Sequence, residues 1–192
     1  MWFLLGGLGL GVAWLAASSS PAPAAMAPPS GTTLEGAVPV SGLPGVYMKR
    51  GVVLSPALLR FLARLRAVVP ASIPLVVTSG VRTPEAQAAA LQRKRTLGDD
   101  LYALYRRGHG PQIVASLLAV ANTVPAMSAV LREWLARGVA MSRHMRGDAL
   151  DLRIRGLSQE QLALLVMMCQ RLGARAVVES RPAHLHIEGL GG

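Results

Sequence analysis

The apolar positions of the chain recur at helical spacing in two stretches, and one further stretch between them has the start signals of a helix. Each of the three is preceded by a hydroxyl side chain that can cap a helix. These stretches begin after Ser55, Thr83 and Ser158, and we expect the second to reach about Arg95 and the third to end at Gly173. A proline at the first helical position supports the first two starts, and a capping-box glutamine supports the third. The first stretch has four leucines on one face: Leu58, Leu59, Leu62 and Leu65.

Four short stretches have the pattern of strands. Residues 75–78 are apolar or β-branched throughout, and residues 149–154 alternate between apolar and polar positions. Residues 175–178 and 183–187 are two further strands near the end of the chain. Helices and strands are mixed without a regular β-α-β order, which indicates the α+β class. We therefore expect a small antiparallel sheet packed with helices.

A helical insert separates the first of these strands from the second. Residues 100–137 have a helical pattern that is interrupted at residues 108–111 and again at Pro125, and Gly138 is a typical helix stop. The insert is therefore predicted to be entirely helical.

The N-terminal segment differs from the rest of the chain. Residues 1–17 contain no charged side chain and predict an export signal or a short membrane anchor. Small residues at 22–25 offer a cleavage site, although no Lys or Arg precedes the apolar run. Residues 18–45 are rich in Ser, Ala, Pro and Gly and predict a linker, so we expect the compact domain over residues 46–192. Export would place this domain in the periplasm or cell envelope.

The composition of the chain limits the kinds of binding site and partner that we expect. The 192 residues, 52% hydrophobic and 16% charged, fit one folded domain with a terminal extension. The single cysteine, Cys169, excludes an intramolecular disulfide and a thiolate zinc cluster, and we place it in the core. The net charge of +10 favours polyanionic neighbours such as membrane surfaces or cell-wall polymers. With 4% aromatic residues and no run of five basic residues, we expect no nucleic-acid partner.

Three of the four histidines follow residue 143, beside acids in a chain that has few of them. Strand alternation places Asp151 on the polar face of its strand, and His184 and His186 on the polar face of the last strand. If the two strands are neighbours, these side chains share one surface, and His144 can reach it from the preceding loop. Two imidazoles and one carboxylate form an open zinc site that leaves a fourth position for water.

Three motifs carry a family resemblance. Residues 142–151 read SRHMRGDALD and resemble the Ser-x-His-x-x-Gly-x-Ala-x-Asp signature of the zinc D-alanyl-D-alanine peptidase and hedgehog-like superfamily. Residues 179–186 (ESRPAHLH) are similar to its second zinc segment, and residues 79–85 (SGVRTPE) to its Ser-Gly-aromatic-Arg-Ser/Thr-Pro-Glu segment. The motifs occur in the family's order. The resemblance implies the family's fold and hydrolysis of amide bonds in peptidoglycan stem peptides.

The resemblance also assigns residues to the metal and to catalysis. It implies Zn2+ held by His144, Asp151 and His186. His184 would be a catalytic histidine beside the metal ligands. Glu179 is the candidate general base, since a carboxylate there can take a proton from water and pass it to the leaving amine.

Two further residues have supporting or binding roles in this assignment. Arg82 would bind a substrate carboxylate or polarise the scissile carbonyl; its alternatives are a helix cap or an ion pair with Glu85. Ser142 would support the histidine loop that follows it by hydrogen bonding. Asp148 is a competing carboxylate, but it lies three positions from Asp151 and should face elsewhere.

The leading hypothesis is an exported zinc metallopeptidase of the D-alanyl-D-alanine carboxypeptidase type, or a related dipeptidase or endopeptidase. One rival is a non-catalytic, hedgehog-like zinc domain that binds cell-wall or protein ligands. A carboxylate of Glu179 near the metal would favour hydrolysis over binding. A third hypothesis, an anchored polyanion-binding protein, requires no metal.

Overall fold

The computed structural model describes residue 34 and residues 36–190. The predicted export signal or anchor at 1–17 and most of the predicted linker lie outside the described residues. Within the described part, no helix combines the length and the apolar character that crossing a bilayer requires.

The α+β class is confirmed, and the strands form one six-stranded sheet in the order β1-β2-β3-β4-β6-β5. The bounds are Ala37–Pro39 (β1), Val46–Lys49 (β2), Leu75–Ser79 (β3), Ala149–Leu152 (β4), Arg175–Ser180 (β5) and Ala183–Glu188 (β6). The sheet is mixed rather than purely antiparallel, because β2 and β3 run parallel. The crossover that this pairing needs is α1, which lies between them in the chain. β1 falls inside the stretch expected to be linker, so the sheet begins before Val46.

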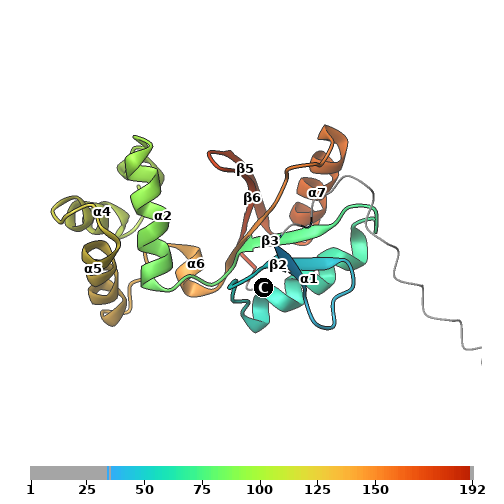
Figure 1. Ribbon diagram of the computed structural model, residues 1–192, viewed down its shortest axis with the longest axis horizontal. Coiled ribbons are helices and arrows are strands. Elements are labelled where there is room, and N and C mark those ends of the chain that lie inside the picture. Colours follow the sequence, from blue (N-terminus) through green and yellow to red (C-terminus); the bar gives the residue numbers. More distant parts are fainter. Residues whose placement is uncertain (1–33, 35, 191–192) are drawn as a thin grey trace, which may run out of the picture.

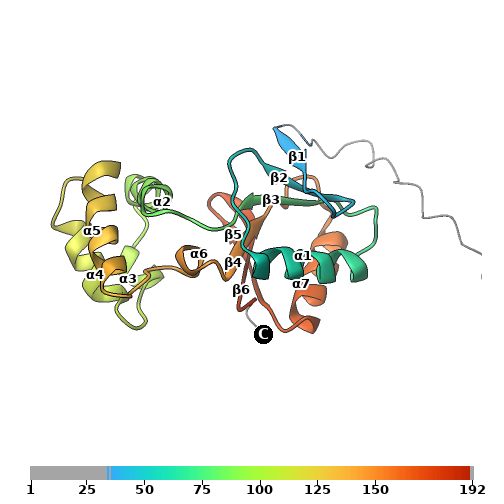
Figure 2. The ribbon, with the colours of Figure 1, turned by 90° about the horizontal axis from the view of Figure 1, so that it is seen from below.

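Two helices cover one face of the sheet. The helices are Pro56–Val68 (α1), Pro84–Thr96 (α2), Leu101–Leu104 (α3), Gly110–Leu118 (α4), Val124–Ala136 (α5), Arg143–Arg146 (α6) and Gln159–Arg171 (α7). α1 and α7 pack together beneath the sheet (Figure 2), and their buried side chains share one apolar core with the strands. Leu62 and Cys169 lie fully buried in this core, as the sequence predicts for the cysteine.

The insert between β3 and β4 forms a second lobe. α2, α3, α4 and α5 pack around their own apolar core, which is separate from the core of the sheet lobe. Figure 1 shows this helical lobe at one end of the molecule, with α6 between it and the sheet. The chain enters the helical lobe from β3 and returns through α6 to β4, so both crossings lie next to the central strands.

The face of the sheet away from α1 and α7 is polar around β4 and β6. Leu150 and Leu152 of β4 point into the core, as do Leu185 and Ile187 of β6, and all four are almost fully buried. Because side chains alternate along a strand, Asp151 and His186 project to the opposite face. They are directly opposite each other in the antiparallel β4–β6 pair.

Candidate metal centre

Three donor atoms converge where β4, β6 and α6 meet. Asp151 Oδ1 lies 2.9 Å from His186 Nδ1 and 3.2 Å from His144 Nε2, and the two histidine nitrogens are 3.3 Å apart. His144 and Asp151 are both buried, with 4% of each exposed. These residues form a group able to hold a metal ion.

Local structure fixes His144 in this position. It lies on the short helix α6 rather than in the expected loop, because the Ser142 hydroxyl caps the helix by accepting from the Met145 backbone N–H. Gly147 ends α6 in the left-handed conformation that favours glycine. The carbonyl oxygen of Gly80 accepts a hydrogen bond from His144 Nδ1 at 2.8 Å. Since a carbonyl can only accept, Nδ1 carries the proton and the lone pair of Nε2 faces the centre.

Neighbouring side chains also hold Asp151 and His186, the other two residues of the group. His186 Nε2 lies 3.3 Å from a carboxylate oxygen of Glu188, an arrangement that leaves Nδ1 facing Asp151. Burial disfavours ionisation of Asp151, but the adjacent His144 and His186 imidazoles and the Arg82 guanidinium hold the pKa of this carboxyl far below its usual range. Burial opposes protonation of His186, but its hydrogen bond with Asp151 raises the pKa of the imidazole. Asp151 is therefore ionised, which is the state that metal binding requires of a carboxylate.

Arg82 directly contacts the candidate metal-ligand group, which consists of His144, Asp151 and His186. Its Nη2 is 2.7 Å from Asp151 Oδ2, the oxygen that does not face the histidines, and its Nε donates to Ser79 Oγ at 2.8 Å. The alternative pair with Glu85 does not form, because Glu85 is bound by Arg132. Arg82 thus orients the carboxylate from behind while also lining the open space in front of the site.

Glu179 and His184 face each other across the β5–β6 hairpin, where they are cross-strand partners. His184 Nε2 lies 3.6 Å from Glu179 Oε2 and 3.5 Å from Asp151 Oδ1. The carbonyl of Pro182 accepts a hydrogen bond from His184 Nδ1 at 2.6 Å, so Nε2 faces the metal-ligand group. Glu179, His184 and His186 form a second group able to hold a metal ion. The structure therefore brings both expected catalytic residues beside the ligand group.

A buried amide that the sequence analysis did not single out connects this centre to the helical lobe. Gln87 of α2 is fully buried, and its Nε2 donates to the Tyr105 hydroxyl at 3.2 Å. Its Oε1 accepts from Ser142 Oγ at 3.1 Å and lies 3.5 Å from Arg82 Nη1. Ser142 therefore supports the site in two ways, through the α6 cap and through Gln87. Asp148, in contrast, turns away and pairs with Arg143.

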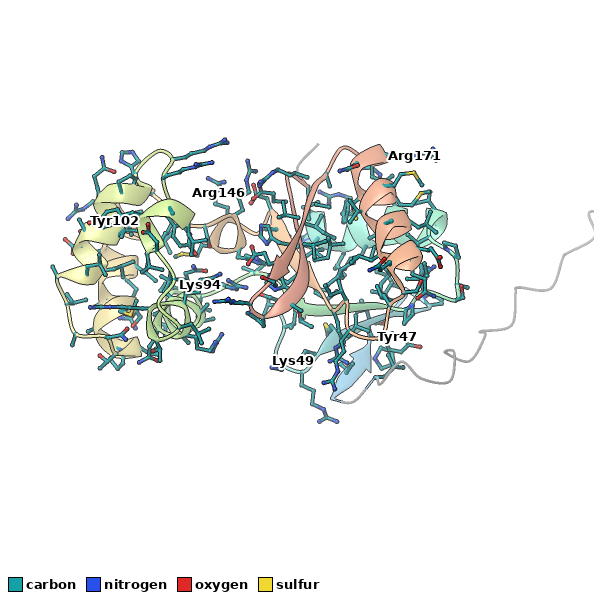
Figure 3. The ribbon with its side chains drawn as sticks, turned by 90° about the horizontal axis from the view of Figure 1, so that it is seen from above. Tyr47, Lys49, Lys94, Tyr102, Arg146 and Arg171 are labelled. Atoms are coloured by element: carbon teal, nitrogen blue, oxygen red, sulfur yellow. The ribbon has the colours of Figure 1, made fainter. Side chains whose placement is uncertain are left out.

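The centre opens into a cleft between the two lobes, lined by residues from α2 to α6 on one side and from the sheet on the other. Figure 3 shows Lys94 extending from α2 toward the β5–β6 hairpin, where its ammonium lies 3.5 Å from Glu179 Oε2. The chain matches no protein-family model, no curated protein and no solved structure in the three comparisons.

Proposed function

We propose that the protein is an exported zinc metallopeptidase that hydrolyses amide bonds in peptidoglycan stem peptides. The observation that carries the proposal is the convergence of His144 Nε2, Asp151 Oδ1 and His186 Nδ1 within 3.3 Å of one another. These are the three residues that the motif resemblance assigns to zinc. Glu179, the acid assigned as the base, stands beside them.

The donor set fits zinc in chemistry and in size. Two imidazoles and one carboxylate suit Zn2+, and bonds of 2.0–2.1 Å at tetrahedral angles place ligand atoms about 3.3 Å apart. The three observed separations are close to this value. The second nitrogens of both histidines are bound by Gly80 and Glu188, which is the outer support that zinc ligands usually have.

The chain's own residues then have distinct tasks. A zinc ion bound here would lower the pKa of water and polarise the scissile carbonyl. Glu179 accepts a proton from the attacking water and returns it to the leaving amine. His184, whose Nε2 faces the same space, stabilises negative charge on the carbonyl oxygen when it is protonated. Arg82 holds the Asp151 carboxylate in place and offers its remaining N–H groups to a substrate oxygen.

The first experiment measures metal content. Full-length protein should contain close to one zinc per chain by elemental analysis, and His144→Ala should lose most of it because two ligands remain. The matched control is His109→Ala, which removes an exposed histidine of the helical lobe. Equal zinc in wild type and His144→Ala would refute the ligand assignment.

The second experiment tests hydrolysis. Wild-type protein is incubated with intact muropeptides and the products are identified by mass, which also separates carboxypeptidase, dipeptidase and endopeptidase cuts. Glu179→Gln preserves size and should keep zinc while turnover falls by about 10²-fold, the usual scale for loss of a general base. His184→Ala should likewise keep zinc and lose rate. Zinc-loaded protein that cleaves no stem peptide would instead indicate the non-catalytic binding domain.

A further inference from the structure

The cleft in front of the metal centre is larger than the usual pocket for a small molecule. Its volume is about 1770 Å3, whereas pockets for small molecules usually measure about 300–1,000 Å3. All three proposed metal ligands line it, together with Glu179 and His184. A substrate that reaches the metal can therefore contact both lobes along its length.

The charge of the cleft is strongly positive. Thirteen of the chain's 20 Lys and Arg residues line it, against three acids. Each of the three acids is already bound by a cation of the same cleft: Asp151 by Arg82, Glu179 by Lys94 and Glu188 by Arg175. A ligand in the cleft therefore meets an excess of positive charge that the protein's own acids do not neutralise.

Unpaired arginines occur on both walls. Arg93, Arg106 and Arg107 lie on the helical lobe, Arg155 and Arg181 lie on the sheet lobe, and all five are exposed. Among the described residues, none of these five forms an ion pair with an acid. The positive charge therefore extends along both walls of the cleft, to either side of the candidate metal ligands, and is not confined to one subsite.

The chemistry of the walls suits oxyanions such as carboxylates. A guanidinium fork binds two carboxylate oxygens at once, and charge gathered in a concave site raises the local concentration of anionic ligands. A single strand of nucleic acid would need aromatic faces for its bases. Among the described residues that line the cleft, Tyr105 is the one Phe, Tyr or Trp, and its hydroxyl is bound to Gln87.

We propose that the arginines of the two walls select substrates by carboxylates on both sides of the scissile amide. The preferred substrate is a stem peptide whose side-chain carboxylates are free. The same peptide with carboxamides in place of these carboxylates is disfavoured. This selection rests on the proposed peptidase function, whose site occupies the same cleft. The arginines act in binding and leave the chemical step to the metal centre, so their removal raises KM more than it lowers kcat.

A binding experiment tests the selection without requiring hydrolysis. Fluorescence anisotropy with the full chain compares a labelled stem pentapeptide with the same peptide in which the side carboxylates are carboxamides. At low salt the free-acid peptide should bind at least about fivefold more tightly, and the difference should shrink as salt screens the charges. The variant Arg106→Ala/Arg107→Ala should lose most of this preference. Its matched control is Arg60→Ala/Arg171→Ala, which removes two exposed arginines outside the cleft.

The outcomes separate this proposal from the peptidase proposal. A clear preference for the free-acid peptide with no cleavage of either peptide supports charge selection and refutes the enzyme. Cleavage of both peptides with equal KM supports the enzyme and refutes charge selection. Equal loss of binding in the cleft variant and in its control would also refute it, as would oligothymidylate bound as tightly as the free-acid peptide.

Discussion

The buried amide of Gln87 gives the sharpest test of how the helical lobe supports the metal centre. Gln87→Leu keeps a side chain of similar size but removes the acceptor of the Ser142 hydroxyl and the donor to the Tyr105 hydroxyl. A buried polar group that loses its partner costs about 1–3 kcal/mol. Two such groups predict that the free energy of unfolding falls by about 2–6 kcal/mol. This is a large part of the total for a domain of this size.

Urea unfolding followed by far-ultraviolet circular dichroism measures this loss. Adding Tyr105→Phe removes the orphaned hydroxyl, so Gln87→Leu/Tyr105→Phe should recover about 1 kcal/mol relative to Gln87→Leu alone. The matched control is Gln170→Leu, an exposed glutamine on α7. A loss below about 0.5 kcal/mol for Gln87→Leu, the usual range of surface substitutions, would refute the proposed connection.

Three further predictions concern the sheet lobe. Ser158→Ala removes the observed capping box of α7 and should lower the free energy of unfolding by about 1 kcal/mol in urea; an unchanged midpoint would contradict this. Leu62→Ala should cost about 2–5 kcal/mol in the same assay because the side chain is fully buried. Leu59, which the sequence pattern placed on the same face, is partly exposed, so Leu59→Ala should cost much less, and equal losses would refute this difference in burial. Burial raises the pKa of Cys169 to about 12, so at pH 8 iodoacetamide should label the thiol only after denaturation, and rapid labelling of native protein would contradict its place in the core.

Local sequence signals predicted the elements that have strong periodicity or caps. Ser55, Thr83 and Ser158 are the N-caps of α1, α2 and α7, as expected from a hydroxyl side chain followed by the other signals of a helix start. The strands β1 and β2 were missed because they are short and lie in or next to a stretch rich in Pro and Gly. β2 gains its place by pairing in parallel with β3, and pairing between distant segments leaves no local pattern in the sequence.

In the candidate site, too, local patterns predicted some features and missed those that depend on the tertiary fold. Alternation within β4 and β6 predicted that Asp151 and His186 would share a face, and the register makes them direct neighbours. Gln87 was not predicted, because a glutamine on a helix is usually exposed and only the packing of α2 against Tyr105 and Ser142 buries it. The positive cleft was not predicted either, since its cations come from segments that only the tertiary fold brings together.

The two lobes have different roles in the proposed function, metal binding and substrate binding, and mutations can separate these roles. All three proposed metal ligands come from β4, β6 and the short helix α6, so backbone pairing within the sheet lobe sets most of the ligand geometry. The helical lobe supplies Gln87 and Lys94, which contact the site, and the arginines of one wall. Changes to exposed arginines of the helical lobe should therefore alter substrate affinity and leave zinc content unchanged. Changes to Asp151 of β4 or to His186 of β6 should alter the metal content itself.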